Sequence, residues 1–213
     1  MIISLDGNVF VGKTTLCNIL SKKNNYNVVL EYSSFIKKID KPSQQFSFLE
    51  HKRYLQVDII RKKYLRDGIN FLDRSFVSLS AHIYALYKIG IADFRKKHIN
   101  LFNKLLDNDG IIIPDYYIFV NCDYNSVKKR FFLEKEICDK KETPEFFINK
   151  NYYLAINEFN SLWQKSIKNG LSVDTSNDSK KNNKINFDKK FSRKLNKKKI
   201  IKIMKSIFWQ EIT

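Results

Sequence analysis

The chain has 213 residues, of which 43% are hydrophobic and 29% are charged, and its formal net charge is +17. This length and composition fit one globular domain and exclude a chain that is disordered throughout. No apolar run approaches the roughly 20 residues that span a bilayer, so no membrane partner is expected. Three widely spaced cysteines form no metal-ligand pattern, which favours a reduced, cytoplasmic protein.

Positive charge is concentrated at the C-terminal end of the chain. Residues 176–213 contain 12 Lys or Arg and 3 Asp or Glu. The Lys- and Asn-rich stretch 178–199 is expected to be a loop, and 200–209 a short terminal helix. Because the excess charge lies largely in this tail, we attribute it mainly to compositional bias, and nucleic acid is not an expected partner. The predicted division is a domain over 1–176 and a basic tail over 177–213.

Short apolar runs predict five strands, over Ile2–Leu5, Asn27–Glu31, Ile69–Asp73, Tyr116–Asp123 and Leu171–Ser176. Helical spacing between them predicts six helices, over Thr14–Lys22, Ser43–Arg66, Phe76–Tyr87, Asp93–Leu106, Asn125–Glu134 and Pro144–Lys168. This alternation predicts an α/β fold, with a parallel five-stranded sheet covered by helices on both faces. Such sheets bind ligands beyond the carboxyl ends of their strands, so the residues that follow the strands are the candidates for a site.

The first predicted strand runs into a glycine-containing loop, Gly-Asn-Val-Phe-Val-Gly-Lys-Thr, which matches G-x-x-x-x-G-K-[ST] in full. Backbone N–H groups of such a loop hold phosphate oxygens, assisted by the positive end of the following helix. Lys13 is expected to reach the β- and γ-phosphates, and the Thr14 hydroxyl to bind Mg²⁺. The residues predicted to bind ATP are Gly7, Asn8, Val9, Phe10, Val11, Gly12, Lys13, Thr14 and Thr15.

Charged residues follow the other strands at the same edge. Asp73 is expected to bind Mg²⁺, directly or through water, with a helix N-cap as the alternative. Arg74 is expected to contact a phosphate of the donor or the acceptor. Glu31 could act as a general base, or fix the substrate or a metal-bound water. Arg130 and the charged segment 135–143 are expected to form a small lid whose cations close over the phosphates.

Several segments, in the same order along residues 1–176, resemble the deoxynucleoside kinase and thymidylate kinase superfamily. They are DGNVFVGKTT at 6–15, FLEHKR at 48–53, LDRSFVSLSAH at 72–82, IPDYYIFVNCD at 113–123 and VDTS at 173–176. The resemblance implies a P-loop NTPase fold and a kinase that uses ATP and Mg²⁺. It also implies that Phe48 and Arg53 bind the acceptor together with Glu31 and Arg74.

These motifs point to different phosphoryl acceptors. The loop DGNVFVGK favours a nucleoside, whereas FLEHKR and DRSFVSLSAH favour a nucleoside monophosphate. Two segments outweigh one, so the preferred function is a nucleoside monophosphate kinase similar to dTMP kinases. The alternatives are a deoxynucleoside kinase that acts on a 5′-hydroxyl, a P-loop ATPase or nucleotide-sensing regulator without a small-molecule acceptor, and a polynucleotide 5′-kinase. A small-molecule nucleoside or monophosphate is the expected partner, and a homodimer is left open.

Overall fold

The computed structural model describes residues 1–24, 26–36, 47–138, 144–176 and 195–210. Its centre is a five-stranded parallel sheet with the order β2-β3-β1-β4-β5. The strands are β1 (Ile2–Gly7), β2 (Asn27–Val29), β3 (Asn70–Asp73), β4 (Tyr116–Asn121) and β5 (Gly170–Asp174). The predicted α/β fold is confirmed. Strand β1 lies in the middle of the sheet, so its carboxyl end lies at the centre of the candidate site.

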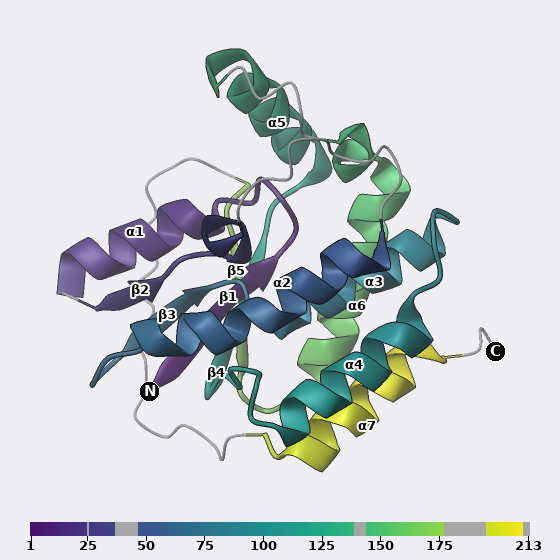
Figure 1. Ribbon diagram of the computed structural model, residues 1–213. Helices are drawn as coiled ribbons and strands as arrows, with labels where there is room; N and C mark the ends of the chain where they lie inside the picture. The colour runs from purple at the N-terminus through teal and green to yellow at the C-terminus, as the bar shows by residue number, and fades with distance from the viewer. Residues whose placement is uncertain (25, 37–46, 139–143, 177–194, 211–213) are drawn as a thin grey trace.

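Helices cover both faces of the sheet. Ile3 and Leu5 pack with Cys17 of α1 (Lys13–Asn24) and Val127 of α5 (Tyr124–Cys138). The other face carries a larger core, to which five helices contribute. They are α2 (Phe48–Arg61), α3 (Phe76–Lys88), α4 (Arg95–Asp107), α6 (Lys150–Ser166) and α7 (Lys197–Phe208), which Figure 1 shows apart from α1 and α5.

Two helices are shorter than the sequence predicts because polar side chains set their first turns. Ser47 caps α2 by accepting a hydrogen bond from the Glu50 N–H at 3.2 Å, and the helix ends at Arg61 in a 3₁₀ turn. Asn149 caps α6 by accepting from two N–H groups, so 145–148 form a separate 3₁₀ turn. The start predicted for the first of these helices, 43–46, lies outside the described residues.

The predicted lid segment 135–143 falls partly within a helix. Helix α5 continues to Cys138, beyond the predicted end at Glu134. Residues 139–143 lie outside the described part of the chain.

The predicted terminal helix is confirmed as α7, and it packs into the larger core. Ile200 and Met204 are fully buried, and the Phe208 ring stacks on Tyr84 with centroids 6.4 Å apart. Arg95 of α4 donates to the Phe208 carbonyl at 2.7 Å, and Figure 1 shows α4 and α7 side by side. The folded unit therefore includes residues on both sides of 177–194. Within the described ranges, no helix combines the length and apolar character that crossing a bilayer requires.

A buried hydrogen-bonded chain of histidines joins three helices of this core. His51 Nε2 of α2 lies 2.7 Å from His98 Nδ1 of α4, and His98 Nε2 lies 3.0 Å from Ser80 Oγ of α3. The Ser80 hydroxyl donates to the Phe76 carbonyl, so His98 Nε2 donates to Ser80 and His98 Nδ1 accepts from His51. Burial lowers the pKa of His98 to about 3 and, with the neighbouring histidines, lowers that of His51 as well. Both rings are neutral at pH 7 and act as hydrogen-bonding groups inside the core.

These histidines predict a loss of stability in mild acid. Their pKa values are lower in the folded protein than in the unfolded chain, where histidine titrates near ~6.5, so the unfolded state binds more protons below that pH. For His98 the lost stability amounts to about 2 kcal/mol at pH 5. Urea unfolding at pH 7 and pH 5 measures it, with His98→Gln as a variant that keeps a hydrogen-bonding side chain but does not titrate. An equally steep pH dependence in His98→Gln would contradict this assignment.

Candidate active site

The glycine-containing loop is fixed by one close backbone approach and by packing of its middle residues. Gly7 has φ +145°, and a Cβ on it would lie 2.2 Å from the Val120 carbonyl oxygen of β4. Only glycine therefore fits where β1 passes into the loop. Phe10 and Gly12 have left-handed backbones, with φ 58° and 87°, while Val11 is buried and the Phe10 ring lies edge-on to Phe131 at 5.2 Å.

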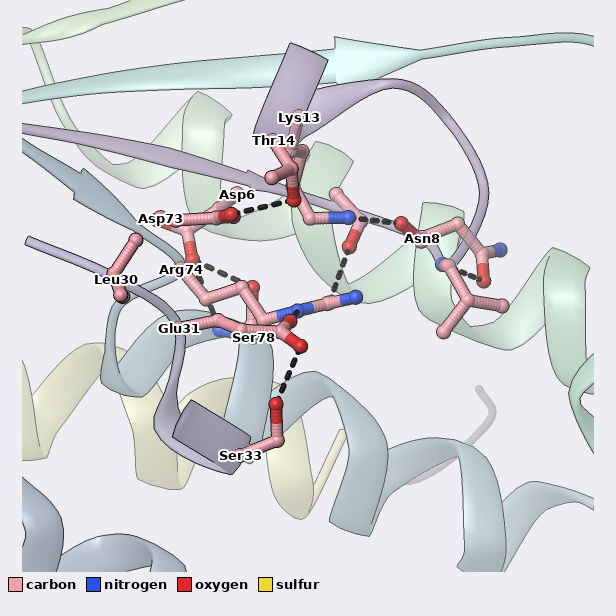
Figure 2. Close-up of polar contacts among 12 residues, drawn as sticks. Asp6, Asn8, Lys13, Thr14, Leu30, Glu31, Ser33, Asp73, Arg74 and Ser78 are labelled. Atoms are coloured by element: carbon pink, nitrogen blue, oxygen red, sulfur yellow. Dashed lines mark hydrogen bonds and ion pairs between the residues drawn. The ribbon is translucent and has the colours of Figure 1, made fainter. Parts of the chain in front are cut away.

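The loop is also anchored through Asn8 and Lys13. The buried Asn8 amide donates from Nδ2 to the Tyr153 carbonyl of α6 at 3.1 Å, and its Oδ1 accepts from the Val9 N–H at 2.9 Å. Lys13, which begins α1, is 4% exposed and donates from Nζ to the Asn8 carbonyl (Figure 2). Burial lowers the pKa of Lys13 to about 7, and the Arg74 charge adds to this effect against three nearby carboxylates. The ammonium is thus poorly compensated by the protein alone and suited to a polyphosphate.

Thr14 and Asp73 meet at the predicted metal site. The Thr14 hydroxyl donates to Asp73 Oδ2 at 2.6 Å (Figure 2). Asp73 is 1% exposed, and its Oδ1 has no hydrogen-bond partner among the described residues. Buried carboxylate oxygens are normally paired, so this oxygen beside a hydroxyl fits a small hard cation such as Mg²⁺. Within the described residues no group of three or more His, Cys, Asp or Glu could hold a metal ion.

The alternative role of Asp73 as a helix cap does not apply, because the next serine performs it. Ser75 is the N-cap of α3, and its hydroxyl accepts from the Val77 N–H at 3.2 Å. The carboxylate of Asp6, fully buried at the end of β1, in turn accepts from the N–H and hydroxyl groups of both Ser75 and Ser78, at 2.6 to 3.2 Å. Asp6 therefore fixes the start of α3 directly beyond Arg74.

Glu31 and Arg74 form an ion pair between the ends of β2 and β3. Arg74 Nε donates to Glu31 Oε2 at 3.1 Å, and the Ser33 hydroxyl donates to Oε1 at 2.5 Å (Figure 2). Burial alone raises the pKa of Glu31, but the Arg74 charge and the hydrogen bonds from Ser33 and Arg74 together lower it below its usual value. Glu31 is therefore ionised at neutral pH, as a proton-accepting group must be.

The Arg74 backbone is held in a strained conformation. Its φ is 68°, a left-handed value that is costly for a residue other than glycine. The Arg74 N–H donates to the Leu5 carbonyl at 3.0 Å, and its Nη1 donates to the Gly7 carbonyl at 3.4 Å. Hydrogen bonds to β1 and to the loop thus hold the Arg74 side chain between the loop and Glu31.

Aromatic and imidazole groups that sequence reasoning did not assign to the site lie near Arg74. His82 Nδ1 of α3 is 2.6 Å from the Tyr152 hydroxyl of α6, and the rings of Phe146 and Phe147 lie near His82. Burial and the Arg74 charge lower the pKa of His82 to about 3, so the ring is neutral. Burial, Glu50 and Glu31 raise the pKa of Tyr54 of α2. His82 is the last residue of the segment LDRSFVSLSAH, and this segment was the sequence signal that could have revealed it.

Phe48 and Arg53 both lie on α2. Phe48 begins α2 and packs against Phe94 and His51, with ring centroids 5.6 and 5.9 Å apart. Arg53 is exposed on the same helix. Their acceptor-binding roles stay predictions.

Arg130 lies beside the loop at the junction of β4 and β5. Its Nη2 donates to the Thr175 carbonyl at 2.7 Å, and its Nη1 lies 3.2 Å from Cys122 Sγ and 3.4 Å from the Phe10 carbonyl. The Thr175 hydroxyl donates to the Val11 carbonyl at 2.7 Å. Arg130 therefore ties the VDTS segment to the loop, and its action on phosphates stays a prediction.

A loop with the G-x-x-x-x-G-K-[ST] motif, the Thr14–Asp73 hydroxyl–carboxylate pair and an ionised glutamate thus share one sheet edge. A model of the deoxynucleoside kinase family matches residues 3–207. The chain belongs to the deoxynucleoside kinase family. The match includes α7 as well as the sheet, and it makes the protein a phosphotransferase. The resemblance drawn from the sequence motifs is confirmed.

Solved structures support the fold. Deoxyadenosine kinase from M. mycoides with bound dATP is similar with a TM-score of 0.58 and 16% identity, covering 82% of this chain and 91% of that one. The same enzyme with bound dCTP gives a TM-score of 0.59 and 16% identity, with 82% and 90% covered. At this identity the likeness shows a shared P-loop kinase fold. A search of curated proteins found no match.

The lowered pKa of Lys13 predicts that ATP binding takes up a proton at pH 8. Lys13 is largely neutral there without nucleotide, and a bound triphosphate stabilises the ammonium and raises its pKa. Calorimetric titration with ATP in two buffers of different ionisation enthalpy measures the uptake, in which the Lys13 contribution should approach about one proton at pH 8 and vanish at pH 6. Lys13→Met should abolish the uptake and reduce phosphoryl transfer roughly 10²-fold or more. Undiminished uptake in Lys13→Met would show that another group titrates.

Proposed function

We propose that this enzyme transfers the γ-phosphoryl group of ATP to the 5′-hydroxyl of a deoxyribonucleoside. The observation that carries the proposal is the ionised Glu31 carboxylate, held by Arg74 at the sheet edge that also carries the phosphate-binding loop. A hydroxyl acceptor must lose a proton during transfer and gains from a positioned base. Membership of the deoxynucleoside kinase family supports the same acceptor class.

The monophosphate acceptor favoured by two sequence segments has less support. A monophosphate is already anionic and requires cations more than a base. Arg74 is paired with Glu31 at 3.1 Å, and Arg53 is exposed on α2. The family match and this charge pairing therefore favour the 5′-hydroxyl, which was the first alternative, over the monophosphate.

Each group at the edge has a role in this reaction. The loop N–H groups and Lys13 bind the triphosphate and stabilise the charge that develops on it. Thr14 and Asp73 would hold Mg²⁺, which supplies neutralisation of the β- and γ-phosphate oxygens when bound. Glu31 accepts the proton of the acceptor hydroxyl. Arg74 keeps Glu31 ionised and oriented, and it adds positive charge beside the loop.

Substitution of Glu31 and Arg53 tests the acceptor assignment. Glu31→Gln removes the base while keeping the size and a hydrogen-bonding group, so kcat with deoxynucleosides should fall by about 10² to 10⁴. Arg53→Ala, on an exposed side chain, should change kcat and the KM for the acceptor by less than about threefold. Initial rates across a panel of deoxynucleosides and monophosphates measure both effects.

The opposite pattern would refute the proposal. It would consist of a wild type that prefers monophosphates, with Arg53→Ala raising the KM for them more than Glu31→Gln lowers kcat. ATP hydrolysis that no acceptor in the panel alters would instead favour an ATPase or a nucleotide-sensing regulator.

A further inference from the structure

Arg61, in the last turn of α2, is a fully buried arginine that sequence reasoning assigned no role. Its relative exposure is 0%, and it is among the largest fully buried side chains of the described residues. Burying a guanidinium is costly unless its donors are paired. Its partners therefore indicate what its burial achieves.

The guanidinium bridges the carboxyl ends of β2 and β3. Arg61 Nε donates to the Leu30 carbonyl at 3.0 Å. Its Nη2 donates to the carbonyls of Asp73 and Arg74, at 3.1 and 2.9 Å. Leu30 directly precedes Glu31, so one side chain holds the backbone at Glu31 and at the Asp73–Arg74 pair.

This bridge begins where backbone pairing between the two strands stops. The β2–β3 ladder ends at the pair Val29 and Leu72. The next residues, Leu30 and Asp73, present carbonyl oxygens to the same guanidinium. The planar guanidinium has donors in fixed directions, so it can bind two separate carbonyl oxygens at once. A lysine ammonium is a compact point charge and does this less well.

Asp58 and Tyr32 also contact the Arg61 guanidinium and fix its position. Its Nη1 pairs with Asp58 Oδ1 at 2.9 Å, one turn earlier in α2, and Asp58 Oδ2 accepts from the Ile112 N–H at 3.1 Å. The Arg61 Cζ atom lies 4.3 Å from the centroid of the buried Tyr32 ring. Both chain neighbours of Glu31 therefore contact this guanidinium.

We propose that Arg61 is a positioning residue that sets the distance and orientation between the proton acceptor Glu31 and the Asp73–Arg74 pair. It acts through backbone carbonyls and through Arg74, without touching substrate. The inference rests on the proposed function, because it takes Glu31 as the group that receives the acceptor proton. It predicts that weakening the hydrogen bonds of the Arg61 guanidinium lowers kcat more than it weakens ATP binding.

Arg61→Lys tests the inference, with Arg66→Lys as the matched control on an exposed arginine. Arg61→Lys should lower kcat for deoxynucleosides roughly 10- to 100-fold, since small misplacement of reacting groups is enough. The KM for ATP should change less than about threefold, because the phosphate-binding loop is unaltered. Weaker contact with Arg74 should also raise the pKa of Glu31 and move the acidic limb of the kcat–pH profile to higher pH. Arg66→Lys should match the wild type in all three.

A double-mutant cycle separates positioning from a general loss of structure. In the Glu31→Gln background, Arg61→Lys should have much less effect on kcat than in the wild type, because the group it positions is gone. If Arg61→Lys does not fold, Tyr32→Leu loosens the same guanidinium and should shift kcat and the pH profile in the same direction by less. An unchanged kcat and pH profile in folded Arg61→Lys or Tyr32→Leu, or fully additive effects in the cycle, would overturn the inference. Failure of the wild type to phosphorylate deoxynucleosides would instead overturn the proposed function, and the cycle would then be run on the acceptor it uses.

Discussion

Pairing of charged groups at one edge of the sheet is the constraint on which the site depends. Lys13, Glu31, Asp73 and Arg74 lie at the same edge, where Lys13 and Asp73 are buried and the Glu31 and Arg74 side chains are 37% and 22% exposed. Charges in this environment are tolerated only when they are paired or hydrogen-bonded. Glu31 with Arg74 and Asp73 with Thr14 satisfy this condition in part. An anionic nucleotide would pair with Lys13, whose pKa is lowered, and a cation would bind the Asp73 oxygen that has no hydrogen-bond partner among the described residues.

The surrounding structure is arranged to hold these pairs in place. Asp6 fixes the start of α3, and Arg61 joins the ends of β2 and β3 beyond their last backbone pair. Asn8 ties the phosphate-binding loop to α6. Helix α6 in turn packs against α3 and α7 in the larger core. The C-terminal helix therefore supports the site indirectly, through the helices on which the loop and the strand ends rest.

The parts of this site that local sequence determines were predictable, and those that depend on the packing of distant segments were not. The loop motif and the apolar strand before it predicted the positions of Lys13 and Thr14, and an acid at a strand end predicted Asp73. Direct pairing of Glu31 with Arg74 could not be read from residues 43 positions apart. Arg53 was chosen from a motif; it is exposed on α2, and its role stays a prediction.

Arg61 was missed because an arginine on a helix usually lies at the surface. Its spacing of three from Asp58, on the helix face that also buries Leu55, was the available signal. Mg²⁺, the homodimer, the cytoplasmic location and the absence of a nucleic-acid partner stay predictions.

The most direct test of this account is to identify the phosphorylated product of the wild-type enzyme. The full-length protein would be incubated with Mg²⁺ and ATP, together with each deoxynucleoside or each deoxynucleoside 5′-monophosphate, and the products followed by ³¹P NMR. Formation of a 5′-monophosphate from at least one deoxynucleoside, at a rate well above ATP hydrolysis without acceptor, is the predicted result. Formation of diphosphates from monophosphates with no reaction of any deoxynucleoside would contradict it.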